Sequence, residues 1–275
     1  MRIGVISSWR DTLALFQFLN RYNNEYLIYC DQEWFPFEEK SLETTMSRIM
    51  RGVEFLKSKW VDSIIVDPIY ELELKYFGDE NVNNVIMPLF QKYLQEHVFR
   101  YSLVGKIWIL TDFWSFSQTQ NLIEKEEKTY NLTEEQKSVK KFSFPFHYRV
   151  KVASSWTANI NDLWVHNPYL IRSMKNNLRY FKDAYVDTVI PMHYQYFRMQ
   201  RTIKSFFNFN KIRFHDLSIL ENEFKKLLEE AGGDDEGNYS VSLLINQPSE
   251  FITRDKQLMW LLQRWKSNKV SIDKI

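Results

Sequence analysis

The sequence is poor in cysteine and glycine. Cys30 is the only cysteine among the 275 residues, so no intramolecular disulfide can form, as is typical of proteins from a reducing compartment. The 7 glycines leave few backbone cradles for a phosphate group, and no G-x-G-x-x-G, P-loop or C-x-x-C pair is present. We therefore expect no nucleotide cofactor, no metal ion and no other cofactor.

Long apolar runs and an excess of charge are also missing. No apolar run approaches the length of a transmembrane helix, and the first residues, Met1 to Ile6, lack the apolar core of a signal peptide. The 36 basic and 35 acidic residues give a net charge of +1, which favours neither a nucleic-acid nor a membrane partner. The sequence predicts a cytoplasmic protein.

What the sequence does contain is an alternation of short apolar runs and helical patterns, within a chain of 44% apolar residues. The runs predict strands at 2–7, 25–30, 63–66, 107–110, 150–154 and 188–190. Helical periodicity predicts helices near 12–21, 41–58, 168–183, 195–206, 217–230 and 254–266. This order predicts an α/β fold with mostly parallel sheets flanked by helices. The charge-rich stretch 124–141 is expected to be a solvated helix or loop, with a docking site as the alternative.

Three segments resemble the glutamate racemases of the aspartate/glutamate racemase superfamily. Residues 31–41 read DQEWFPFEEKS and are similar to the family's Asp, four variable residues, Pro-Tyr-Gly, one residue and Lys-Ser. Residues 67–70 read DPIY where the family has Ala-Cys-Asn-Thr. Residues 186–194 read VDTVIPMHY and resemble a family strand that ends in Gly-Cys-Thr-His-Tyr-Pro. The run 242–262 resembles the family's closing strand and helix.

The resemblance implies two pseudo-symmetric α/β domains with a cleft between them. The first would comprise 1–100 plus 214–275, and the second 101–213. Family members need no cofactor and are commonly dimers, so the resemblance also implies a homodimer.

The resemblance places the family's two catalytic cysteines at Pro68 and Pro191. In the family one cysteine acts as thiolate base and the other as thiol acid, one from each domain. Proline has no titratable side chain. We therefore expect a glutamate-racemase-like pseudoenzyme that acts by binding or assembly. The alternatives are an isomerase or racemase-type enzyme that uses Asp67 and His193 in place of the cysteines, and a chain that is an amino-acid racemase by family label only.

The resemblance also indicates which residues would meet a small-molecule or protein ligand: Ser7, Ser8, Pro36, Phe37, Tyr70, Ser115, His193 and Tyr194. Several depart from the family, because Ser7-Ser8 replaces Asp-Ser and residues 111–115 (TDFWS) replace a Thr-x-Gly-Thr-like segment. The loop aromatics are expected to plug the former pocket or to line a site for another ligand: Trp34, Phe35, Phe37, Phe113 and Trp114. Cys30 is expected to be a buried apolar group.

Overall fold

A computed structural model describes the protein at residues 1–7, 24–31, 40–66, 70, 74, 102, 105–129, 147–153, 156, 159, 167–183, 185–193, 196, 199–207, 212–214, 240–245 and 269–274. The chain divides into two compact units. Unit 1 comprises Met1–Ile86 and Leu217–Ile275, and unit 2 comprises Met87–Asp216. The predicted joins at 100/101 and 213/214 stay a prediction.

Unit 1 contains a five-stranded sheet in the order β3-β1-β2-β8-β9. Its strands are β1 (Arg2–Ile6), β2 (Glu25–Cys30), β3 (Ser63–Val66), β8 (Ser240–Ile245) and β9 (Lys269–Lys274). Every neighbouring pair is parallel. The carboxyl ends of all these strands therefore lie at one edge of the sheet.

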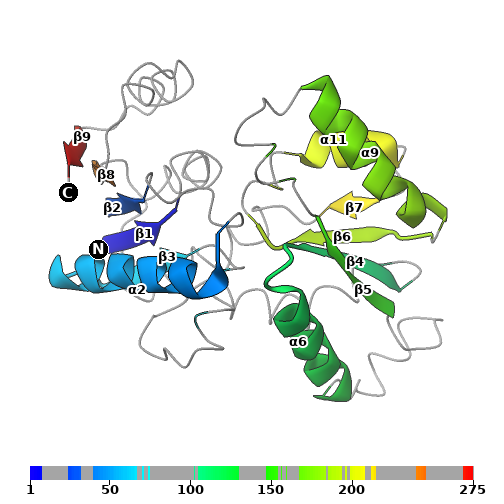
Figure 1. The fold of residues 1–275 in the computed structure, drawn as a ribbon, viewed down its shortest axis with the longest axis horizontal. Coiled ribbons are helices and arrows are strands. Elements are labelled where there is room, and N and C mark those ends of the chain that lie inside the picture. The colour runs from blue at the N-terminus through cyan, green and yellow to red at the C-terminus, as the bar shows by residue number, and fades with distance from the viewer. Residues whose placement is uncertain are drawn as a thin grey trace. The chain divides into compact units, whose positions relative to one another are not determined.

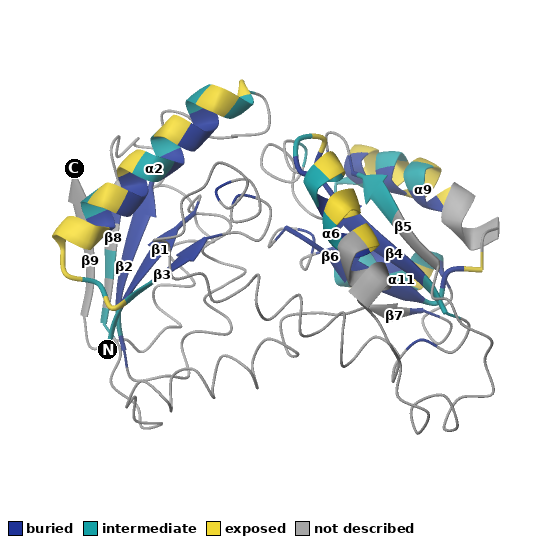
Figure 2. Cartoon of the chain, turned by 90° about the horizontal axis from the view of Figure 1, so that it is seen from below, coloured by how far each residue is buried: buried dark blue, intermediate teal, exposed yellow. Residues whose placement is uncertain are grey.

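Helix α2 (Leu42–Ser58) packs one stripe of its surface onto this sheet. It begins at Ser41, whose hydroxyl accepts a hydrogen bond from the Thr44 amide, with Glu43 in the first turn. The stripe is buried and the opposite face is exposed (Figure 2). Gly52 lies in the stripe, where an added Cβ would come within 2.9 Å of the Tyr29 ring. The helix thus approaches the sheet more closely than any larger residue permits.

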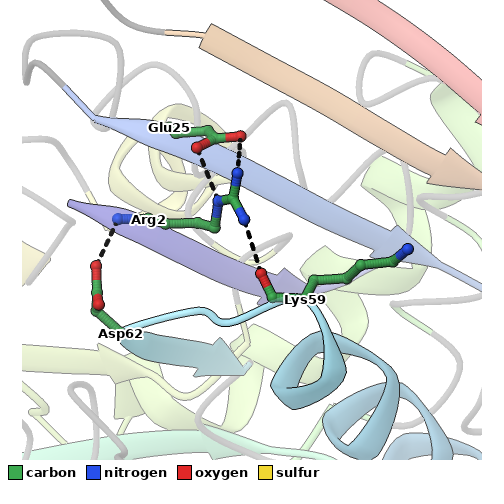
Figure 3. A network of polar contacts seen from close by, with 4 residues as sticks. All are labelled: Arg2, Glu25, Lys59 and Asp62. Carbon is green, nitrogen blue, oxygen red and sulfur yellow. Dashed lines mark hydrogen bonds and ion pairs between the residues drawn. The ribbon is translucent and has the colours of Figure 1, made fainter.

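The amino-terminal edge of the same sheet is tied together by Arg2 (Figure 3). Its guanidinium donates to both carboxylate oxygens of Glu25, at 2.7 and 2.9 Å, and to the Lys59 carbonyl at 2.8 Å. Its amide donates to Asp62 at 2.7 Å. The hydrogen bond to Glu25 is the main reason why the pKa of Arg2 is raised. These contacts join β1 to β2, to the end of α2 and to the residue before β3.

Unit 2 contains a four-stranded sheet in the order β5-β4-β6-β7, again with every pair parallel. The strands are β4 (Lys106–Thr111), β5 (His147–Val152), β6 (Thr188–Pro191) and β7 (Arg213–Phe214). Helix α6 (Phe116–Thr129) lies on one side of this sheet, and α9 (Pro168–Asp183) and α11 (Gln200–Phe206) lie on the other (Figure 1).

The core of unit 2 lies between the sheet and the helices α9 and α11. Trp108 and Leu110 of β4 face it, and Leu170, Met174 and Leu178 of α9 recur every four residues along one helix face. All five side chains are buried. Burial of apolar residues of this size stabilises the fold by about 2 kcal/mol each.

The predicted α/β class with parallel sheets and flanking helices is confirmed. The strands predicted at 25–30 and 63–66 and the helix at 168–183 have the predicted bounds. The strand predicted at 150–154 is wrong in position, because β5 spans His147–Val152.

The other predicted elements differ in extent or lie elsewhere. The helix predicted at 195–206 is shorter, because α11 begins at Gln200. The charge-rich stretch is helical as far as Thr129, where α6 ends. The helices predicted at 12–21, 217–230 and 254–266 lie outside the described residues.

Candidate functional site

The carboxyl ends of three neighbouring strands meet in unit 2. The Met192 amide donates to the Leu110 carbonyl at 2.9 Å, and the Ala153 amide donates to the Thr111 carbonyl at 2.8 Å. These bonds extend the pairing of β4 with β6 and with β5 past the strand ends. Open parallel sheets bind ligands outside the carboxyl ends of their strands, so this edge is the first place to look for a site.

Buried polar side chains gather at this edge, around the turn from β4 into α6. Thr111, Ser115 and Thr119 are 0% exposed and Asp112 is 4% exposed. Asp112 Oδ1 accepts a hydrogen bond from the Ser115 amide at 2.8 Å, and the Ser115 carbonyl accepts from the Thr119 amide at 2.8 Å. Ser115 thus begins the hydrogen bonds of α6, and Asp112 holds the amide just before the helix.

Two hydroxyl groups of this cluster have no hydrogen-bond partner in the part of the chain that the structure describes. They belong to Thr111, at the end of β4, and to Thr119, in the first turn of α6. Buried hydroxyls are normally paired with protein, water or ligand. The edge therefore has unused capacity for hydrogen bonds.

His193 follows β6 at the same edge and is 0% exposed. Its ring lies 5.2 Å from that of Tyr196, and Tyr196 in turn meets Trp156 edge-on at 5.9 Å. The His193 carbonyl accepts from the Tyr196 amide at 2.9 Å. The imidazole is thus built into an aromatic stack of the unit 2 core.

In unit 1 the corresponding edge carries Ser7, Asp31 and Tyr70, which are all buried. The Ser7 amide donates to the Tyr29 carbonyl at 3.2 Å. Asp31 follows β2 and lies 3.4 Å from Arg48 of α2. Burial, with a smaller contribution from Asp31, raises the pKa of Tyr29. Asp31 begins the segment that resembles the racemases, and its ion pair gives it a structural role.

The two units repeat one pattern of hydrogen bonds. In unit 1 the Asp62 amide donates to the Arg2 carbonyl at 2.8 Å, and in unit 2 the Asp187 amide donates to the Lys106 carbonyl at 3.1 Å. The sequences that follow are similar, since residues 60–65 read WVDSII and residues 185–190 read YVDTVI. This repeat aligns the strands of the two units without reference to any other protein.

The repeat corrects the predicted pairing of Pro68 with Pro191. Ile6 pairs with Val66 in unit 1, and Leu110 pairs with Pro191 in unit 2. Pro191 is therefore the counterpart of Val66. Counting two residues onward from each strand makes His193 the counterpart of Pro68. The assignment of Pro191 to a cysteine position of the family stays a prediction.

The remaining predicted site residues lie outside the described residues: Ser8, Pro36, Phe37, Asp67, Pro68 and Tyr194. Trp34 and Phe35 lie outside them too. Phe113 is 78% exposed, which does not support a plug at that side chain, and Trp114 is half-buried. Cys30 is 0% exposed at the end of β2, as predicted for a buried apolar group.

Sequence reasoning did not identify Asp112 and Thr119 as site candidates. An Asp followed three residues later by the start of a helix is a capping signal, and it could have drawn attention to Asp112. Within the described ranges, no group of three or more His, Cys, Asp or Glu residues could hold a metal ion. No described helix is long and apolar enough to cross a membrane.

Comparison with known proteins gives a match of fold. No protein-family model matches the sequence, and no curated protein matches it. Among solved structures, glutamate racemase isoform RacE1 from Bacillus anthracis superposes with a TM-score of 0.71 at 16% identity, over 99% of this chain and 96% of that one.

Two further solved structures extend this likeness. Glutamate racemase from Francisella tularensis, in complex with D-glutamate, gives a TM-score of 0.68 at 14% identity, over 99% of this chain and 97% of that one. Aspartate racemase from Picrophilus torridus gives 0.53 at 14% identity, over 85% and 95%. At such low identity the likeness concerns the fold alone.

Proposed function

We propose that this chain, which has the fold of the glutamate racemases, is a pseudoenzyme that does not racemise amino acids and that acts through binding or assembly. The observation that carries the proposal is the cysteine count. Inverting an α-carbon requires a base on one face and an acid on the other, and the resemblance implies that the family uses two cysteines for these roles. The sequence contains a single cysteine.

The location of that cysteine supports the proposal. Cys30 is fully buried in the sheet of unit 1 and pairs through its backbone with Ile245 of β8. A nucleophilic or basic cysteine is normally at least partly exposed, in an electropositive environment. Cys30 thus behaves as a small core residue, and no second thiol exists to complete a pair.

One observation favours a second candidate, an isomerase or racemase-type enzyme that uses Asp67 and His193. The repeat between the units makes His193 the counterpart of Pro68, so one of the two equivalent positions carries an imidazole. Against this candidate stands the packing of His193, because its ring is buried against Tyr196. A general base must reach the proton that it abstracts.

Formation of D-glutamate and D-aspartate from the L-enantiomers tests the proposal. The purified chain is incubated with each L-amino acid, and the products are separated by chiral chromatography. The pseudoenzyme proposal predicts no D-enantiomer above a protein-free blank. Formation of D-enantiomer that is lost in His193→Gln would instead establish the second candidate.

The proposed role in assembly has its own test. The resemblance implies a homodimer, for which light scattering after size-exclusion chromatography should give twice the 33.4 kDa of one chain. A mass of one chain at all concentrations would leave binding of a ligand or of another protein as the proposed role.

A further inference from the structure

We infer that Asp112 determines the ligand class of unit 2: its carboxylate excludes free carboxylates from the carboxyl edge of the sheet and makes this edge a site for hydrogen-bond donors, such as a primary ammonium group. The inference deepens the proposed function, on which it rests, because it states what a binding scaffold of this fold would and would not accept.

The first step concerns the start of α6. Helix N-termini attract anions, because their first amides are unpaired and the helix dipole is positive there. In this chain Asp112 Oδ1 already accepts the Ser115 amide at 2.8 Å. The protein's own carboxylate thus occupies the place at which a carboxylate ligand would be most favourably bound.

The second step concerns charge. Asp112 is 4% exposed, so water screens its carboxylate poorly. A second carboxylate brought within a few ångströms would be repelled at an effective dielectric constant far below that of water. A ligand that donates hydrogen bonds would be attracted by the same group.

The third step concerns the hydroxyls beside Asp112. Thr111 precedes it directly and Thr119 lies in the first turn of α6, and within the described residues neither hydroxyl oxygen has a partner. Both residues are 0% exposed. A hydroxyl oxygen accepts hydrogen bonds as well as donating one, so both can serve a ligand rich in donors.

The test compares the wild-type chain with Asp112→Asn. Asparagine keeps an oxygen that can accept the Ser115 amide but removes the charge. The probes are L-glutamate and D-glutamate, titrated by isothermal calorimetry into the full chain. We expect no measurable binding to the wild type, and in the variant an affinity for at least one enantiomer at least tenfold higher than the wild-type limit.

Matched variants guard the interpretation. Glu124→Gln removes the same charge from the exposed face of α6 and should leave glutamate binding as in the wild type. Asp112→Ser keeps a capping oxygen and should act like Asp112→Asn if that variant does not fold. Equal glutamate affinity in wild type and both Asp112 variants, including no binding to any of them, would overturn the inference. Racemisation by the wild type would overturn the proposed function, whatever Asp112→Asn does.

Discussion

Gly52→Ala should destabilise unit 1, although alanine is the better helix former. In an exposed helix interior, replacing Gly by Ala stabilises by about 1 kcal/mol. At Gly52 the new methyl would meet Tyr29 Cδ1 at 2.9 Å and Cε1 at 3.0 Å. That ring cannot move freely, because Phe55 packs against it with 5.6 Å between the centroids. Overpacking of a core costs about 1–3 kcal/mol, so we expect a net loss of about 1 kcal/mol in the free energy of unfolding.

The assay is urea unfolding followed by circular dichroism, with two comparisons. Ser47 lies on the exposed face of the same helix, and the difference between Ser47→Gly and Ser47→Ala measures the helix preference alone. In a Tyr29→Val background the obstructing ring is gone, so there Gly52→Ala should stabilise. A coupling of about 2 kcal/mol between the two sites is expected. If Gly52→Ala stabilises the wild type as much as alanine does at Ser47, the close approach of α2 to the sheet is refuted.

The remaining predictions concern stability. Trp60→Gly should raise the free energy of unfolding by about 1 kcal/mol, because Trp60 has a φ of 59° and is 86% exposed, so glycine relieves strain and loses little burial; a loss of stability in urea unfolding would contradict this. Since the pKa of Tyr29 is raised on folding, its contribution is present below the unfolded pKa of about 10 and is lost as the pH rises through the folded value. Tyr29→Phe should therefore lose less stability than the wild type between about pH 8 and about pH 11, and parallel losses in the two proteins would contradict the assignment.

The central strands could be predicted from the sequence because they are continuous apolar runs. β2 (EYLIYC) and β4 (KIWILT) are buried on both faces, and such strands show no alternation. β5 (HYRVKV) and β9 (KVSIDK) lie at the edges of their sheets and mix charged with apolar residues. This mixture hid the start of β5 and the whole of β9. Helix α6 (FSQTQNLIEKEEKT) has few apolar residues, so its periodicity gave a weak signal.

The candidate site was harder to predict than the fold. The sequence showed two strands that end near proline, and it suggested that Pro68 and Pro191 are equivalent. The equivalence of Pro191 with Val66 depends on strand register, which a sequence with continuous apolar runs leaves open. The role of Asp112 likewise depends on which amide its carboxylate reaches and on how deeply it is buried.

The central claim, that this racemase fold performs no proton transfer on amino acids, is tested most directly by exchange of the α-proton. L-glutamate and, separately, L-aspartate are incubated with the purified chain in deuterated buffer, and the α-proton signal is followed by NMR. The account predicts the same slow loss of signal as in a protein-free blank. Loss that scales with protein concentration would contradict it, and its disappearance in His193→Gln would identify the group that transfers the proton.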